Sequence, residues 1–295
     1  MRILDFGSLN IDYVYQVDHM VRPGETLATG RRDVYPGGKG LNQAVACARA
    51  GAKVWQAGLV GPEGGLLLDV CREAGVNTDY VRTVDVASGH TVIQVDGGGQ
   101  NCILLYGGAN QRVDEAYADE VLSHFSAGDY VILQNEISCL PHIVDAAAAR
   151  GMRVVLNPSP YNEALEAVDM SKVSLFLLNE VEGAQVAGGS EDPDEVLARL
   201  GEKCPDAAVV LTLGSEGSRY QRGDERYAQG IYHVDAKDTT AAGDTFTGYF
   251  VWAVSEGRPV PEALDIAAKA SAIAVSRAGA VPSIPTIDEV MAAKL

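Results

Sequence analysis

The sequence predicts an α/β fold: a doubly wound, mostly parallel sheet flanked by helices, with a small inserted antiparallel β-sheet that forms a lid. Three observations predict it. Apolar runs of strand length alternate with longer segments of helical period. Many of these runs are apolar on both faces, as in parallel strands that helices cover on each side. Two stretches rich in Thr, Val, Ile, Tyr and Gly break the alternation and have no helical period.

The predicted elements follow one another along a single domain, residues 1–295. Strands are expected at residues 3–7, 54–58, 130–134, 153–157, 174–178 and 209–213. Helices are expected at residues 41–50, 64–73, 140–150, 196–204, 244–256 and 261–278. The lid is expected at approximately 10–36 and 88–107, and an ordinary extension of the sheet edge is the alternative interpretation of these two stretches.

The composition indicates which classes of partner to exclude. With 23 Lys and Arg against 40 Asp and Glu, the net charge is -17. This charge repels phosphate backbones and anionic lipid, so we expect neither nucleic acid nor membrane as a partner. The five cysteines are scattered without CxxC spacing, which indicates a reducing cytoplasm and no zinc site. No signal-peptide or membrane-spanning pattern is evident, so we expect a cytoplasmic protein.

The most informative segment is DTTAAGDTFTG at 238–248. Apolar residues after it recur with helical period, so a helix is expected to start near Ala242 to Asp244. Small residues before a helix N-terminus leave backbone N–H groups open to an anion. A carboxylate in the same turn, Asp244, is well placed to take a proton from a nucleophile that attacks a phosphate. The alternative is that Asp244 is only a favourable first-turn acid.

A second glycine-rich element, PGGKGLNQ at 36–43, precedes an Ala-rich helix. Its glycines let the backbone approach a ligand, and Lys39 and Asn42 offer donors for hydroxyl groups. It is not a Walker A loop, because Gly40 rather than Ser or Thr follows the lysine, and the chain has no GxGxxG fingerprint. The alternative is a turn that caps a buried helix.

Polar residues also follow several predicted strands. They are Asn10, Asp12, Asn135, Glu136, Asn179, Glu182, Thr212, Gly214 and Ser215. In an open α/β sheet the carboxyl ends of the strands line the ligand crevice, so these residues are expected to converge on one site.

Together these motifs resemble the ribokinase (PfkB-type) family of carbohydrate kinases over nearly the whole chain. The matching segments are GSLNID at 7–12, PGET at 23–26, GGKGLNQA at 37–44, NEVE at 179–182, LTLG at 211–214, DTTAAGDTFTG at 238–248 and AIAVSRAGA at 272–280. Two positions depart from the family pattern: Gly61-Pro62-Glu63 replaces a Gly-Asp-Asp, and Ala268 stands where Asn or His is common near adenine.

The resemblance implies ATP-dependent phosphorylation of the terminal CH2OH of a sugar, with D-ribose going to D-ribose 5-phosphate as the expected reaction. It implies that Asp244 is the catalytic base and that the amides of Ala241, Ala242 and Gly243 form an anion hole. The implied sugar-binding residues are Asn10, Asp12, Gly38, Lys39, Asn42, Glu136 and Asp244. The implied nucleotide contacts are Asn179, Thr212 and Gly214, and Glu182 organises Mg2+ through water.

The resemblance further implies a monovalent cation, usually K+, on oxygens of Asp238, Thr240, Ala274, Arg277, Gly279 and Ser283, and a homodimer through the lid. Alternatives are a kinase for fructose or a nucleoside, and a non-catalytic sensor of sugar or nucleotide. The missing dinucleotide fingerprint disfavours an NAD-dependent dehydrogenase.

Overall fold

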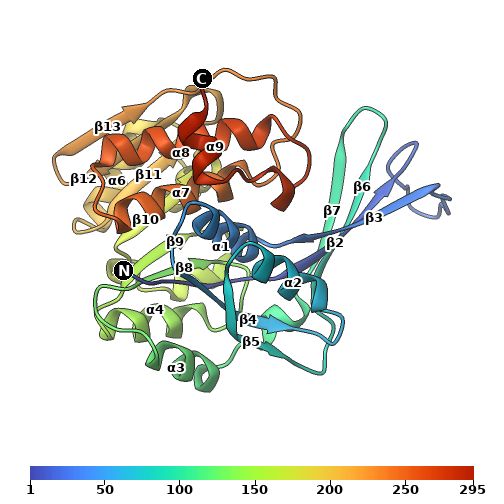
Figure 1. The fold of residues 1–295 in the computed structure, drawn as a ribbon, viewed down its shortest axis with the longest axis horizontal. Helices are drawn as coiled ribbons and strands as arrows, with labels where there is room; N and C mark the ends of the chain where they lie inside the picture. Colours follow the sequence, from blue (N-terminus) through green and yellow to red (C-terminus); the bar gives the residue numbers. More distant parts are fainter.

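The computed structural model describes all residues, 1–295, and its centre is a nine-stranded sheet (Figure 1). The strands are β1 (Ile3–Phe6), β4 (Val54–Val60), β5 (Asn77–Thr83), β8 (Tyr130–Gln134), β9 (Arg153–Asn157), β10 (Leu175–Asn179), β11 (Ala208–Thr212), β12 (Ser218–Arg222) and β13 (Glu225–Gln229). Their order is β13-β12-β11-β10-β9-β8-β1-β4-β5. All neighbours from β11 to β5 are parallel, and β12 and β13 add an antiparallel edge. The mostly parallel α/β fold is confirmed.

Helices cover both faces of this sheet (Figure 1). On one face lie α1 (Lys39–Arg49), α2 (Gly65–Glu73), α7 (Ala242–Ser255), α8 (Val260–Val275) and α9 (Ile287–Ala292). On the other lie α3 (Glu115–Ser123), α4 (Leu140–Ala149), α5 (Glu180–Val186) and α6 (Pro193–Lys203). Short 3-10 turns occur at Gly108–Arg112, Glu163–Ala167, Met170–Lys172, Gly214–Glu216 and Val281–Ser283. No helix has the length and apolar character needed to cross a bilayer.

The alternation of side chains along the strands builds a core on each side of the sheet. In β1, Ile3 belongs to the cluster under α1 and α7, whereas Leu4 and Phe6 belong to the cluster under α3 and α4. The two clusters contain 37 and 35 buried residues. Because a packed core covers each face of the central sheet, a ligand can reach the sheet only at the ends of its strands.

A second sheet extends away from the body (Figure 1). It contains β2 (Asn10–Gln16), β3 (Arg31–Gly37), β6 (Gly89–Val95) and β7 (Asn101–Tyr106), in the order β3-β2-β6-β7. Its outer pairs are antiparallel, but β2 and β6 run parallel, so the expectation of a purely antiparallel lid is corrected. The reason is topological: between β2 and β6 the chain passes through β3, α1, β4, α2 and β5, and it then re-enters the lid in the direction of β2.

Candidate active site

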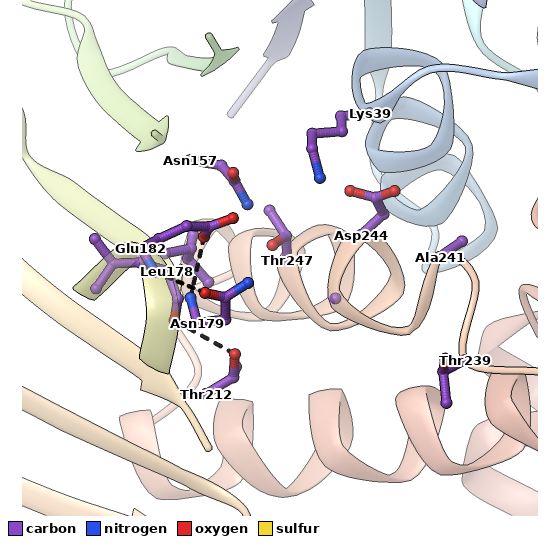
Figure 2. Close-up of a pocket in the computed structure, with 12 residues that line it drawn as sticks. Lys39, Asn157, Leu178, Asn179, Glu182, Thr212, Thr239, Ala241, Asp244 and Thr247 are labelled. Carbon is purple, nitrogen blue, oxygen red and sulfur yellow. Dashed lines mark hydrogen bonds between the residues drawn. The ribbon is translucent and has the colours of Figure 1, made fainter. Parts of the chain in front are cut away.

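A polar cavity of about 220 Å3 opens at the carboxyl ends of β9, β10 and β11, where the N-terminal ends of α1 and α7 meet (Figure 2). Its walls therefore come from elements far apart in the sequence. The lining residues are Lys39, Asn157, Leu177, Leu178, Asn179, Glu182, Thr212, Thr239, Ala241, Gly243, Asp244 and Thr247.

The first turn of α7 keeps backbone donors free. Ala241 stands before the helix in the left-handed conformation (φ 59°), and no side chain caps the turn. The amide of Ala242 donates to the carbonyl of Thr239 (3.2 Å), so this expected anion-hole donor is engaged. No protein oxygen accepts the N–H of Ala241 or Gly243. These two amides, at the positive end of a 14-residue helix, make one wall of the cavity attractive to an anion.

Asp244 is buried on the same turn, and α1 holds its carboxylate from both sides. Asn42 Nδ2 donates to Oδ2 (2.9 Å) and Gln43 Nε2 donates to Oδ1 (2.9 Å). The helices can approach this closely because position 248 of α7 is glycine, where a Cβ would collide with the side chain of Ala46. The packing of α7 on α1 thereby fixes the direction in which the carboxylate points.

Lys39 points toward Asp244 and into the cavity (Figure 2). Burial lowers the pKa of its ammonium group, but the carboxylates of Asp244, Glu136 and Glu182 outweigh burial, and the pKa rises above its ordinary value. Burial raises the pKa of Glu136, a shift that Lys39 and the hydroxyl of Ser8 only partly oppose. The cavity therefore contains one firmly cationic side chain in an otherwise acidic protein.

A second cavity of about 190 Å3 holds two of the expected sugar-binding residues, Asn10 and Glu136. Its other lining residues are Leu105, Gly107, Asn110, Gln111, Asn135, Pro160 and Asn162. Lys39 connects the two cavities, because its side chain lines the first and its amide donates to Glu136 Oε2 (3.3 Å).

Three other expected sugar-binding residues lie close by without lining either cavity. Asp12 accepts a hydrogen bond from Thr91 across the lid (2.5 Å). Burial raises its pKa, against the effect of that hydrogen bond. Gly38 (φ 94°) gives α1 its first turn, and Asn42 acts on Asp244. The structure thus gathers the expected residues around one crevice but not all on one surface.

The expected nucleotide contacts lie on the opposite side of the first cavity (Figure 2). Asn179 and Glu182 form a capping box at the start of α5, with hydrogen bonds of 2.8 and 3.1 Å, and Thr212 donates to the carbonyl of Leu178 (3.3 Å). Gly214 follows β11 but does not line the cavity. No cluster of three His, Cys, Asp or Glu encloses a metal site. On this side of the cavity the carboxylate is that of buried Glu182, and one carboxylate suits Mg2+ that keeps its waters and phosphate ligands.

The expected monovalent-cation residues come from two loops that meet at Asp238. Its carboxylate accepts from the amides of Thr240 (2.9 Å) and Gly279 (2.8 Å). These bonds outweigh partial burial and lower the pKa of Asp238. The hydroxyl of buried Ser283 donates to the carbonyl of Ala280 (2.7 Å). Of the remaining two, Ala274 lies in the last turn of α8, and Arg277 pairs with Glu289 (2.6 Å) through its guanidinium. The hydrogen bond from Gly279 to Asp238 brings the two loops into contact.

Sequence reasoning did not single out several lining residues. Asn157 and Thr247 line the first cavity, and Asn110, Gln111 and Asn162 line the second. A signal existed for Asn157, which ends β9 as Gln134 and Asn179 end their strands. No sequence motif around Asn110 predicts that it belongs to the site. Its amide reaches Asn10 Oδ1 (2.7 Å) only after the lid has folded against the body.

Comparison with known proteins establishes the class. The family model described as pfkB family carbohydrate kinase matches residues 2–287, and the chain belongs to this family of carbohydrate kinases. A curated ribokinase from Haemophilus influenzae is 36% identical over 295 residues, which cover 97% of this chain and 95% of the relative.

Solved structures agree with this assignment. A ribokinase from Thermotoga maritima matches with a TM-score of 0.88 at 32% identity, covering 98% of both chains. The structure of Arabidopsis thaliana ribokinase complexed with ribose and ATP matches with a TM-score of 0.86 at 30% identity, covering 98% of this chain and 97% of that one. The chain is therefore a sugar kinase of the ribokinase type.

Proposed function

We propose that this protein transfers the γ-phosphoryl group of ATP to the terminal hydroxyl of D-ribose, giving ADP and D-ribose 5-phosphate. The observation that carries the proposal is the meeting, in one cavity, of the clamped carboxylate of Asp244, the free amides of Ala241 and Gly243, and the cationic Lys39. The similarity to a ribokinase solved with ribose and ATP supports the choice of both substrates.

In the proposed reaction the sugar hydroxyl oxygen bonds to the γ-phosphorus while the bond from phosphorus to the bridging oxygen of ADP breaks. The hydroxyl proton passes to Asp244, which acts as the general base. The amides of Ala241 and Gly243 and the Lys39 ammonium stabilise the charge on the phosphoryl oxygens, which is the main requirement of a loose transition state. The Ala242 amide can join them only if it leaves Thr239.

The second cavity suits a small hydroxyl-rich sugar. Amide and carboxyl side chains dominate its lining, and Leu105 is the main apolar contact. No aromatic ring that could stack on a nucleobase lines it. We assign Asn10 and Glu136 to sugar hydroxyls on this basis. We also propose sugar contacts for four residues near the two cavities: Asp12, Gly38, Lys39 and Asn42.

On the nucleotide side we propose that ATP contacts Asn179, Thr212 and Gly214, with Mg2+ held by its phosphates and by Glu182 through water. When bound, Mg2+ neutralises phosphate charge. We also propose a K+ ion near Asp238 and a homodimer formed through the lid. The structural support for the ion is the direct contact of Asp238 with Gly279, which brings the two loops together.

The substrate is tested by a coupled ADP-release assay with D-ribose, fructose and a nucleoside, ranked by kcat/KM. We expect D-ribose to rank first. A higher rank for fructose or the nucleoside would replace the substrate but leave the kinase assignment. ATP turnover that responds to no sugar would instead favour the non-catalytic sensor.

The role of Asp244 is tested by Asp244→Asn, which keeps the size of the side chain and removes the base. General-base catalysis contributes roughly 10²- to 10⁴-fold, so we expect kcat to fall at least about 100-fold while ribose affinity changes little. Asp288→Asn is the matched control, because Asp288 is an exposed acid in the first turn of α9. An Asp244→Asn enzyme with most of its turnover would rule out the proposed base.

A further inference from the structure

A chain of buried polar side chains runs from Asp244 into the core beneath the central sheet. Gln43, which donates to Asp244, accepts through its Oε1 a hydrogen bond from Gln134 Nε2 (2.8 Å). The same Nε2 lies 3.3 and 3.5 Å from the two oxygens of Asp5. Asp5 is fully buried on β1, and the proposed reaction gives it no role.

The direction of each amide in this chain matters, because an amide donates at nitrogen and accepts at oxygen. Asp244 is a proton acceptor on both oxygens, so Gln43 must present Nε2 to it. Gln43 is held in that direction only while Gln134 presents its own Nε2 to Gln43 Oε1. Gln134 in turn needs an acceptor for its second N–H, and Asp5 supplies one.

The surroundings of Asp5 favour its neutral form. Burial raises its pKa well above the ordinary value, and the charge of Asp244 adds to this, while the hydrogen bond from Gln134 and the nearby amide of Gln56 offset only a part. No cation acts on the group. The groups that face it are Gln43 and Cys47 of α1, Gln56 of β4, Cys71 of α2, Gln134 of β8 and Asp244 of α7.

A proton on Asp5 also resolves an unpaired acceptor. Gln134 Oε1 is buried without a hydrogen-bond donor. It faces the same side of Gly7 as Asp5 Oδ1, since an added Cβ on Gly7 would lie 2.1 Å from Gln134 Oε1 and 2.4 Å from Asp5 Oδ1. A protonated Oδ1 can donate to Gln134 Oε1 while Oδ2 accepts from Gln134 Nε2. The resulting pair of hydrogen bonds permits one orientation of the Gln134 amide.

We infer that Asp5 is a positioning residue of the kinase: it orients Gln134 and Gln43, and through them it fixes the carboxylate that accepts the substrate proton. The inference rests on the proposed role of Asp244. Asp5 itself touches no substrate, because it lines neither cavity.

Two substitutions distinguish a positioning role of Asp5 from a role in core packing alone. Asp5→Asn reproduces the donor and the acceptor of the protonated acid, so kcat is expected to stay within about twofold of wild type. Asp5→Val has a similar size but cannot hydrogen-bond to Gln134, so kcat is expected to fall roughly tenfold, the scale of one lost hydrogen bond. KM for ribose is expected to stay unchanged in both variants.

The pH profile provides a readout that packing alone would not move. In Asp5→Val the acid limb of the kcat profile is expected to shift to higher pH, because a carboxylate that loses a donor favours its charged form less. In Asp5→Asn the limb is expected to stay in place. Ile3→Val, a buried change on the same face of β1, is the control and is expected to match wild type.

An infrared difference spectrum tests the proton without any assay of activity. Wild type minus Asp5→Asn, recorded without substrates at about pH 5, above the ordinary aspartate pKa, is expected to show one protonated-carboxyl band. Absence of that band, wild-type kcat and pH profile in Asp5→Val, or equal impairment of both variants would each overturn the inference. If the wild type showed no sugar-dependent turnover, the proposed function would fail instead, and the spectrum would still report on Asp5.

Discussion

The carboxylate of Asp244 is supplied by one helix and oriented by another. Each of its oxygens accepts one amide hydrogen bond, from Asn42 or Gln43. A carboxylate offers about four lone-pair positions, so each oxygen can still receive a further proton donor. The clamp therefore restricts the rotation of the group without consuming its capacity as a base. Neutral amides achieve this, whereas a cation in direct contact would oppose protonation.

The raised pKa of Asp5 has a consequence for stability that can be measured. The folded protein keeps this proton above the ordinary value of 3.8, where the unfolded chain has released it. Unfolding then releases a proton, so this contribution is complete at acid pH and is lost as pH rises toward the folded-state pKa. Relative to Asp5→Asn, the wild-type unfolding constant is expected to rise about tenfold per pH unit in that range.

Urea unfolding of wild type and Asp5→Asn from about pH 4 to about pH 7 checks this prediction, because titrating groups away from Asp5 cancel in the comparison. Asp288→Asn is the control, and its difference from wild type is expected to depend much less on pH. A difference between wild type and Asp5→Asn that is constant over the whole range would contradict the prediction.

The sequence predicts some residues of the candidate site but not the buried residues that support it. Asp244, Lys39 and Asn42 stand in short glycine-rich motifs whose spacing marks a helix start, and the structure brings them together. Asp5 is a single carboxyl inside an apolar strand, a position where periodicity gives it no special meaning. Its importance depends on Gln43 and Gln134, which are distant in sequence and approach it only in the folded sheet.

Among the secondary-structure elements, burial decides which ones the sequence can predict. Each expected strand and helix is present, with ends shifted by a few residues, because its apolar pattern follows the sheet or helix period. The elements without a prediction include β5, β12 and β13, which lie at the two edges of the sheet. Edge strands carry many polar residues, as in SRYQR and ERYAQ, so no alternation marks them. Helix α5 was also missed, since seven residues are too few for a clear helical period.

Cation dependence is a prediction about two elements, the start of α7 and the end of α8. A monovalent ion beside Asp238 would tie together the loops that set the position of the Ala241 and Gly243 amides. Activity in K+ is therefore expected to exceed activity in a large organic cation by roughly tenfold, the effect of about 1.4 kcal/mol on the barrier.

Substitution localises this cation effect. Asp238→Ala is expected to remove the response to K+, whereas Asp224→Ala, an exposed acid in the turn between β12 and β13, is expected to keep it. Equal activity of the wild type in Na+, K+ and tetramethylammonium would refute the site.

For the whole molecule, the charge of -17 contrasts with the local chemistry of the cleft. An anionic nucleotide meets a repulsive surface overall. The cleft opposes this with Lys39 and with the N-terminal end of α7, both at the carboxyl edge of the sheet. The fold thus places its positive potential where phosphate is expected to bind.

Large apolar side chains are exposed on the lid, most of all on β7. Strand register places Val14, Ile93 and Ile103 on one face, and Tyr13, Val92 and Leu104 on the other. Ile103 is 53% exposed and Leu104 is 68% exposed. A projecting sheet with apolar side chains on both faces is unfavourable in water unless another surface covers it. Helices α1 and α2 reach β3, but most of the lid sheet projects beyond the helices (Figure 1).

We therefore predict a homodimer in which the lids of two subunits cover each other. Light scattering at micromolar concentration is expected to give twice the chain mass. Because Ile103 and Leu104 are adjacent on β7 and point to opposite faces, Ile103→Glu and Leu104→Glu sample both faces, and at least one is expected to give a monomer by burying a charge in the contact. Met291→Glu, at a position of 62% exposure on α9, is the matched control and is expected to stay dimeric. A monomeric wild type, or dimers in both lid variants, would contradict pairing through the lid.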